Sequence, residues 1–311
     1  MTELRIPEGT PEWHAIRLRH VGGSEVAALF GVQEDYQQSL WTLHMVKSGR
    51  IPAPHVDDAP GTRIWYGKKL EPIIAEMAAQ LHGWTVTKGG YCIDDTTPGM
   101  GCSLDYVITE PGPEETKLGF SGPGVLQLKN ADWLAHKRGW VQDEPPFSVI
   151  LQLQHEIACS GYGWGVIGCL VGGNNLPAYR YAAAPKIIEG IRDRVTRFWE
   201  DVRANRPPHV DDSESTAEAI RALYPSAVSL VPIDMTDNPD FDAICAQFLI
   251  TRENRRASDK AEQGVKNELE AILQGATLAE SLGWRVSVAV VEDKPGRRGS
   301  RRLNVTEILR K

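Results

Sequence analysis

The sequence lacks the features of a membrane or secreted protein. No apolar run approaches the ~20 residues that a transmembrane helix needs, and the polar segment Met1–Thr10 has no apolar stretch typical of a secretion signal. The five cysteines are odd in number and form no C-x-x-C pair. This spacing favours reduced thiols and argues against a zinc or iron–sulfur site. We therefore expect a cytoplasmic protein.

An excess of positive charge is also absent. The formal net charge of −7 argues weakly against a protein coated in nucleic acid, although it leaves room for a local basic groove. The 311 residues, with 41% hydrophobic and 24% charged side chains, suit a soluble globular chain with one large domain and an accessory region.

Hydrophobic periodicity predicts an α/β fold. Apolar residues at helical spacing predict helices from residue 67 to Gly83 and over residues 147–160 and 185–204. Short apolar segments predict strands over residues 84–87, 104–108, 125–129, 165–171 and 178–181. The strands at 104–108 and 125–129 flank a Gly/Pro-rich excursion and are suited to pair as a hairpin with a long tip. Ser24 is a candidate N-cap of a short helix over residues 24–30.

The C-terminal third has a different composition. The acidic run Asp211–Ser215 indicates a boundary, and a polar, largely helical stretch follows from about residue 239 to 282. A short strand over residues 284–291 precedes a basic tail made of Arg297, Arg298, Arg301, Arg302, Arg310 and Lys311. The tail is either a solvated terminus or a segment that contacts the DNA backbone.

One pattern carries chemistry. Asp105 ends an apolar stretch, and Lys129 lies on an apolar strand. An acid followed by such a lysine is typical of metal-dependent nucleases, in which acidic groups hold a divalent metal and the lysine positions the attacking water. Where a second carboxylate is expected, the sequence has Gln127.

Further residues strengthen this pattern. Glu71 lies on the helix that begins near residue 67 and offers a carboxylate from another element. Gln152 follows on the helix over residues 147–160, and Ser103 stands two residues before Asp105. Taken alone, each has an ordinary structural explanation, and we expect His155 and Glu156 to lie on a helix surface.

The ordered motifs resemble those of the YqaJ-type viral recombinase family, which includes the phage lambda exonuclease. The resemblance covers roughly residues 10–205. It is carried by Trp13-His14-x-x-Arg17, Val21-Gly22-Gly23-Ser24-Glu25, Gly67-x-x-Leu70-Glu71-Pro72, Ser103-x-Asp105, x-Lys129 and Gln152-x-Gln154.

The resemblance implies a restriction-endonuclease-like core with a mixed central sheet flanked by helices. It implies an exonuclease domain over residues 1–210 and a mainly helical accessory region over 211–311. The expected activity is Mg²⁺-dependent, processive 5′→3′ digestion of double-stranded DNA with two metal ions, and Mn²⁺ is a plausible substitute. The expected partners are DNA ends with a 5′ phosphate, two further copies in a homotrimer, and a phage single-strand annealing protein inside a bacterial host.

The resemblance also assigns roles to residues. Asp105, Gln127 and Glu71 would stand at the metal, Lys129 would orient water, and Gln152 would support the metal or water. The 5′ phosphate would be held by Arg17, Ser24 and Ser103, with Lys137 or Arg138 in place of an absent further arginine. Arg301 and Arg302 would contribute to DNA binding from the tail.

Gln127 leaves three explanations open. In the first, which we favour, Gln127 replaces a catalytic Glu nearly isosterically and impairs cleavage. In the second, the chain works with a Gln ligand. In the third, the protein binds DNA ends without cutting them. A site-specific endonuclease on the same fold is a further alternative.

Overall fold

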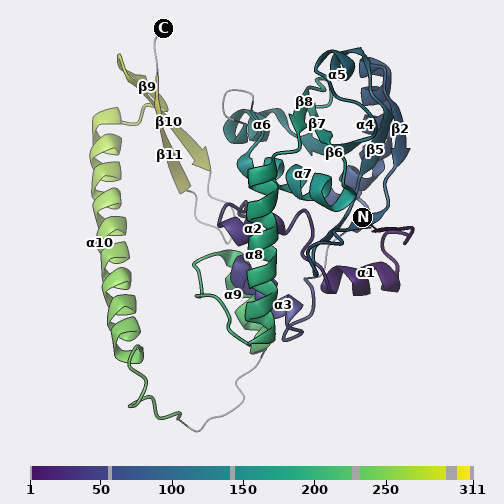
Figure 1. Cartoon of the computed structure of the whole chain (residues 1–311). Helices are drawn as coiled ribbons and strands as arrows, with labels where there is room; N and C mark the ends of the chain where they lie inside the picture. Colours follow the sequence, from purple (N-terminus) through teal and green to yellow (C-terminus); the bar gives the residue numbers. More distant parts are fainter. Residues whose placement is uncertain (1, 55–57, 141–143, 226–231, 292–299, 309–311) are drawn as a thin grey trace. The chain divides into compact units, whose positions relative to one another are not determined.

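The computed structural model describes residues 2–54, 58–140, 144–225, 232–291 and 300–308 (Figure 1). The chain forms two compact units, Met1–Val228 and Ser229–Lys311. Among the described residues, no helix combines the length and apolar character needed to cross a membrane.

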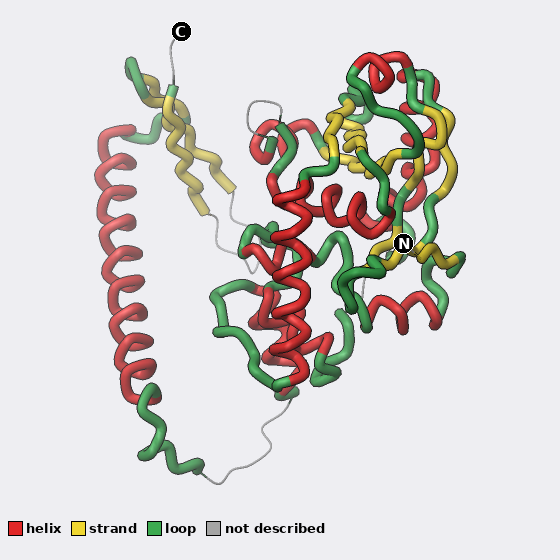
Figure 2. Tube along the Cα trace, in the orientation of Figure 1, coloured by secondary structure: helices red, strands yellow, loops and turns green. Residues whose placement is uncertain are grey.

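A mixed five-stranded sheet forms the centre of the first unit (Figure 2). Its order is β2-β5-β6-β7-β8, in which only β6 and β7 pair in parallel. The strands are β2 (Thr85–Lys88), β5 (Tyr106–Glu110), β6 (Gly124–Ala131), β7 (Trp164–Val171) and β8 (Ala178–Ala182). The predicted hairpin is confirmed, because Tyr106 lies opposite Leu126. Its tip contains the short helix α5 (Pro113–Lys117).

Helices cover both faces of this sheet. The long helix α4 (Arg63–His82) packs Ile74, Ala75 and Ala78 against Leu126 and Leu128 of β6. It ends at Gly83, whose φ of 71° belongs to the left-handed conformation that glycine adopts without steric cost. The opposite face is covered by α7 (Phe147–Ser160), and α8 (Pro185–Arg203) packs on α7. The predicted core, a mixed sheet flanked by helices, is therefore confirmed.

A second, smaller sheet lies against α7. It consists of β1 (Thr2–Leu4), β3 (Tyr91–Ile93) and β4 (Gly101–Ser103), all antiparallel, in the order β1-β3-β4. Both β3 and β4 contact α7. The short helix α6 (Trp133–Gly139) begins the connection from β6 to α7.

Short helices complete the first unit. These are α1 (Pro11–Leu18), α2 (Val26–Phe30), α3 (Leu40–Lys47) and α9 (Glu214–Leu223). Ser24 does not cap α2, whose N-cap is Glu25 without a side-chain bond. The side chain of Ser213 caps α9. Ala219 of α9 packs with Trp41 of α3. The compact units thus divide after α9, whereas the sequence predicts a domain over residues 1–210.

The second unit combines one helix with a sheet. Helix α10 (Phe241–Leu273) precedes a three-stranded antiparallel sheet with the order β11-β10-β9. Its strands are β9 (Leu278–Glu280), β10 (Trp284–Val291) and β11 (Ser300–Glu307). The mainly helical region that the sequence predicts therefore contains a helix followed by a small sheet.

Part of the predicted basic tail is a strand. β11 pairs with β10 along its length. In its sequence, Leu303 and Val305 alternate with polar residues, which is the period of two that a β-strand has. Arg302 is exposed on β11, and only the backbone of Arg301 is described. Arg297, Arg298, Arg310 and Lys311 lie outside the described residues.

The tip of the hairpin offers a test of the fold. Glu115 of α5 is fully buried and accepts hydrogen bonds from Trp84 Nε1 at 2.7 Å and Arg180 Nε at 2.5 Å. Despite burial, these bonds hold the pKa of Glu115 below its ordinary value. We expect Glu115→Gln to lower the free energy of unfolding by about 1–3 kcal/mol, because buried donors lose a charged acceptor.

The matched control is the neighbouring Glu114→Gln. The Glu114 side chain is 68% exposed although it also pairs with Arg180, so its loss should cost less than ~1 kcal/mol. Urea denaturation of both variants measures the difference, and equal losses would contradict this account of the hairpin tip.

Candidate active site

A cavity of about 210 Å³ opens where the N-terminal helix, β4 and α7 meet. Most of the side chains predicted from the sequence converge on it. Its lining includes Arg17, Ser24, Glu71, Ser103, Asp105 and Gln152. A neighbouring cavity of about 190 Å³ shares Glu71, Asp105 and Gln152 and adds Lys129. The residues of the predicted active site thus lie around two adjoining hollows.

Asp105 and Lys129 stand at the centre of this arrangement. Asp105 follows β4, and its Oδ2 accepts a hydrogen bond of 2.9 Å from the backbone N–H of Leu128 in β6. Burial raises the pKa of Asp105, although Lys129 acts in the opposite direction. The Lys129 ammonium donates to Gln152 Oε1 at 2.9 Å. Gln152 therefore holds the lysine by a hydrogen bond, whereas the predicted role of Gln152, support of the metal or water, stays a prediction.

Glu71 joins the site from α4. Its carboxylate pairs with Lys88 of β2, which also lines the larger cavity. Burial, and then the charge of Asp105, raise the pKa of Glu71. The pKa of Lys88 is raised as well: burial alone would lower it, but the Glu71 carboxylate more than compensates. The predicted helix carboxylate consequently stands close enough to Asp105 for the two charges to interact.

Glu156 is a further carboxylate of the cavity that sequence reasoning missed. It is 1% exposed, and its Oε1 accepts a hydrogen bond of 2.8 Å from Gln152 Nε2. Burial, and then the charge of Asp105, raise its pKa to about 8. The expectation that His155 and Glu156 lie on a helix surface is wrong, because α7 is enclosed by β4, β6, α2 and α8. The spacing of four between Gln152 and Glu156 was the available signal.

The loop before α2 approaches Glu156 closely. A Cβ atom at Gly23 would stand 3.0 Å from Glu156 Oε1 and 3.2 Å from Gln152 Cγ. The same loop is anchored by the buried Lys47 ammonium, which donates to the backbone carbonyls of Arg17 and His20 at 2.7 Å each and pairs with Glu25 at 2.8 Å. This anchoring presents Arg17 and Ser24 to the cavity.

Three donors suited to phosphate oxygens surround the cavity. Arg17 lies over the Trp13 ring, with its Cζ 4.3 Å from the ring centroid. The Trp13 indole donates to Ser103 Oγ at 2.9 Å, and Ser24 is exposed at the rim. A planar guanidinium together with two hydroxyls is a set that recognises phosphate.

The remaining predicted DNA contacts lie elsewhere. Lys137 and Arg138 are exposed on α6 and line neither cavity. Lys137 lies over Trp133, with its Nζ 4.9 Å from the ring centroid. Arg302 belongs to the second unit. A role of these residues in DNA binding stays a prediction.

Gln127 is buried beside the site. The side chain has no exposed surface, and neither its Oε1 nor its Nε2 has a hydrogen-bond partner among the described residues. It lies two residues from Lys129 on β6, so both side chains point to the α7 face of the sheet. Gln127 is not among the residues that line the two cavities.

The residues present fit a divalent cation. Among the described residues, Glu156 Oε2 is buried without a hydrogen-bond partner. Gln127 Oε1 and Nε2 are also buried without a partner. Unpartnered buried polar atoms are costly, and the carboxyl groups of Asp105, Glu71 and Glu156 stand near one another in a hollow. Carboxylate and amide oxygens are the ligands that a hard cation such as Mg²⁺ prefers.

Residues 12–163 match the family described as the YqaJ-like viral recombinase domain. This is the family that the ordered motifs of the sequence resemble. No match is found among the curated proteins.

Two solved structures are similar to the chain. An alkaline exonuclease from Laribacter hongkongensis, LHK-Exo, is 21% identical over 63% of this chain and 94% of its own, with a TM-score of 0.49. The structure of LHK-Exo in complex with dAMP is 22% identical, with the same coverage and TM-score.

The pKa of Glu156 generates a prediction about stability. The folded value of about 8 exceeds the ordinary 4.5, so between these two pH values the folded protein holds a proton that the unfolded chain releases. Stability of the metal-free protein should therefore fall as the pH rises from about 4.5 to about 8. Glu156→Gln should flatten this decline, because the amide does not titrate.

Thermal unfolding in the presence of a chelator measures the effect. The exposed helix residue Glu200 provides the matched control, Glu200→Gln, which should leave the pH dependence unchanged. An unaltered pH profile for Glu156→Gln would show that its carboxyl titrates normally.

Proposed function

We propose that the chain is a metal-dependent deoxyribonuclease that digests double-stranded DNA from its ends. The observation that carries this proposal is the convergence of Asp105, Glu71, Glu156 and Lys129 with phosphate-type donors around two adjoining cavities. The match to the viral recombinase family supports the same class of activity. Mg²⁺ is the expected ion, because the available ligands are oxygens, and Mn²⁺ is its closest substitute.

Each part of the site has a task in this proposal. Asp105 and Glu156, with Glu71 from α4, would hold the cation, which when bound acidifies water and neutralises charge on the phosphate. Lys129, fixed by Gln152, orients the attacking water and stabilises negative charge near the scissile phosphorus. Gln152 also bonds Glu156, so one amide positions both the lysine and the carboxylate.

Glu156 offers an explanation for Gln127. The expected carboxylate on β6 is missing, but a buried carboxylate enters the same site from α7. We propose that Glu156 supplies the charge that Gln127 lacks. Of the three explanations for Gln127, this favours a working site with Gln in place of Glu over an impaired one.

The position of the phosphate donors supports digestion from the 5′ end. Arg17, Ser24 and Ser103 line the same cavity as Asp105, so a terminal 5′ phosphate held there places the adjoining nucleotides near the metal. A 5′→3′ exonuclease is therefore proposed. Processivity through a homotrimeric ring, an annealing protein as partner and a location in the cytoplasm of a bacterial host are proposals that rest on the family alone.

A second candidate function is binding of DNA ends without cleavage. The observation in its favour is Gln127, whose amide brings no negative charge to a site where a carboxylate is expected. Intact product after incubation with Mg²⁺, together with retained end binding, distinguishes this candidate from a nuclease.

Relocation of the carboxylate can be tested by exchanging residues 127 and 156. We expect Glu156→Gln to lower Mg²⁺-dependent digestion of linear duplex at least ~100-fold, because a metal ligand is lost. In that background, Gln127→Glu should restore part of the activity. Gln127→Glu alone should change the rate little, since the wild-type site already has its carboxylate.

The opposite pattern refutes the relocation. Activity that survives in Glu156→Gln and rises in Gln127→Glu would show that Gln127 impairs the wild-type enzyme. Lack of digestion in all four proteins, with end binding intact, would favour the second candidate function.

The role of Arg17 can be tested with its neighbour as control. Arg17→Ala should slow digestion of 5′-phosphorylated duplex by ~10-fold or more, because about 1.4 kcal/mol corresponds to tenfold and a charge-assisted bond is worth at least that. Digestion of duplex with a 5′ hydroxyl should change little. Arg19→Ala, at an exposed position next to α1 that does not line the cavity, should leave both rates unchanged.

A further inference from the structure

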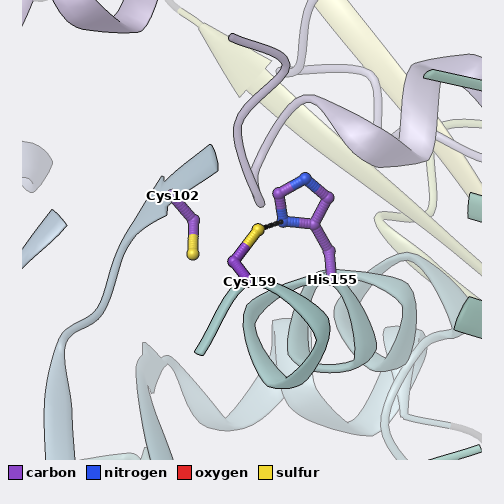
Figure 3. Close-up of side chains that lie close together, drawn as sticks. All are labelled: Cys102, His155 and Cys159. Atoms are coloured by element: carbon purple, nitrogen blue, oxygen red, sulfur yellow. Dashed lines mark hydrogen bonds between the residues drawn. The ribbon is translucent and has the colours of Figure 1, made fainter. Parts of the chain in front are cut away.

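Three soft metal ligands face one another between β4 and α7, next to the cavity but not part of the proposed Mg²⁺ site (Figure 3). Cys102 comes from β4, and His155 and Cys159 come from α7. Their ligand atoms all lie within 4.8 Å of one another. His155 and Cys159 are four residues apart, so they share one face of the helix. The cluster thus joins two elements that are distant in sequence.

The spacing of these atoms suits a tetrahedral ion. Zinc bonds of ~2.3 Å to sulfur and ~2.0 Å to nitrogen place neighbouring ligand atoms roughly 3.5–3.8 Å apart. The distance from Cys159 Sγ to His155 Nδ1 is 3.7 Å. The remaining separations among the three ligand atoms are at most 4.8 Å, about 1 Å longer than this range.

The histidine already has the form that a metal requires. His155 Nε2 lies 3.1 Å from the carbonyl oxygen of Val21. A carbonyl only accepts hydrogen bonds, so Nε2 carries a proton, and Nδ1, which faces Cys159, is the nitrogen available to bind a metal. A second ring nitrogen that donates to a backbone carbonyl is the usual companion of a metal-bound histidine.

Charge and burial point to a thiophilic divalent ion. Cys102, His155 and Cys159 are at most 2% exposed. Zn²⁺ with two thiolates and a neutral imidazole carries no net charge, and a third thiolate leaves the site with a single negative charge. The ion therefore neutralises most of the charge of the ligands that are buried with it. Magnesium and calcium are disfavoured because they prefer oxygen ligands.

Cys92 is the candidate for a fourth ligand, although it does not belong to the group of three whose ligand atoms all lie within 4.8 Å of one another. Cys92 of β3 lies directly opposite Cys102 in the antiparallel register, so both side chains point to the same face of the small sheet. It is 1% exposed and packs in the same core. The lack of a C-x-x-C pair does not bear on this cluster, since its members come from three separate elements.

We infer that Cys102, His155 and Cys159, with Cys92 as the fourth ligand, bind Zn²⁺ or another thiophilic divalent transition ion. The ion ties β4, which leads into Asp105, to α7, which carries Gln152 and Glu156. Its role is structural: it holds two walls of the active site together and is separate from the cation that supports cleavage.

Cobalt titration of the full-length, reduced and chelator-stripped protein tests this inference. We expect saturation at one equivalent, with thiolate-to-cobalt charge transfer in the near ultraviolet and the visible bands of tetrahedral Co²⁺. Cys159→Ser and Cys102→Ser should weaken binding at least ~10-fold. Cys92→Ser should retain binding but lower the charge-transfer intensity by about one third, as one of three thiolates is lost.

Cys169→Ser is the matched control, because Cys169 is equally buried but lies on β7 and outside the cluster. It should leave the cobalt spectrum unchanged. If folded wild-type protein with titratable thiols gives no thiolate bands with Co²⁺, the inference is wrong, whether or not any variant folds. The readout is spectroscopic, so it is independent of nuclease activity in Mg²⁺.

Discussion

The packing of α7 against β4 and β6 is the constraint on which the site depends. One helix supplies the apolar side chains Leu151 and Leu153 to the core and directs Gln152 and Glu156 to the cavity. The cost of burying these polar groups is offset by the core that surrounds them. The same packing brings His155 and Cys159 to Cys102, so a small displacement of α7 would disturb both groups of residues together.

Glu156 and Gln127 illustrate how a site can keep its charge while its sequence pattern changes. A nuclease of this class needs carboxylates in a fixed place, and the element that supplies them matters less than the position of the oxygens. In the proposed site, Asp105 stands on one side and Glu156 of α7 on the other, and Glu156 supplies the carboxylate that the strand lacks. On this proposal, a motif that is incomplete in sequence is completed by a residue from another element.

Much of the fold could be predicted from the sequence. The bounds of α7 follow from its apolar spacing, the end of α4 from Gly83, and the β5–β6 pair from the hairpin pattern. The burial of Glu156 could not be predicted, because a charged residue at that spacing is usually solvated and only the tertiary arrangement encloses it. The sequence does not predict β11, since its arginines mask the alternation of Leu303 and Val305. The predicted domain over residues 1–210 leaves out α9, because the contacts that hold α9 to α3 are distant in sequence.

The distribution of the site along the chain bears on its assembly during synthesis. The cavity takes Arg17 from α1, Glu71 from α4, Asp105 from the end of β4 and Glu156 from α7. Since chains emerge from the ribosome N-terminus first, no shorter nascent segment contains the full set of carboxylates. The proposed nuclease site can therefore form only after more than half of the first unit has been made, when α7 docks on its sheets.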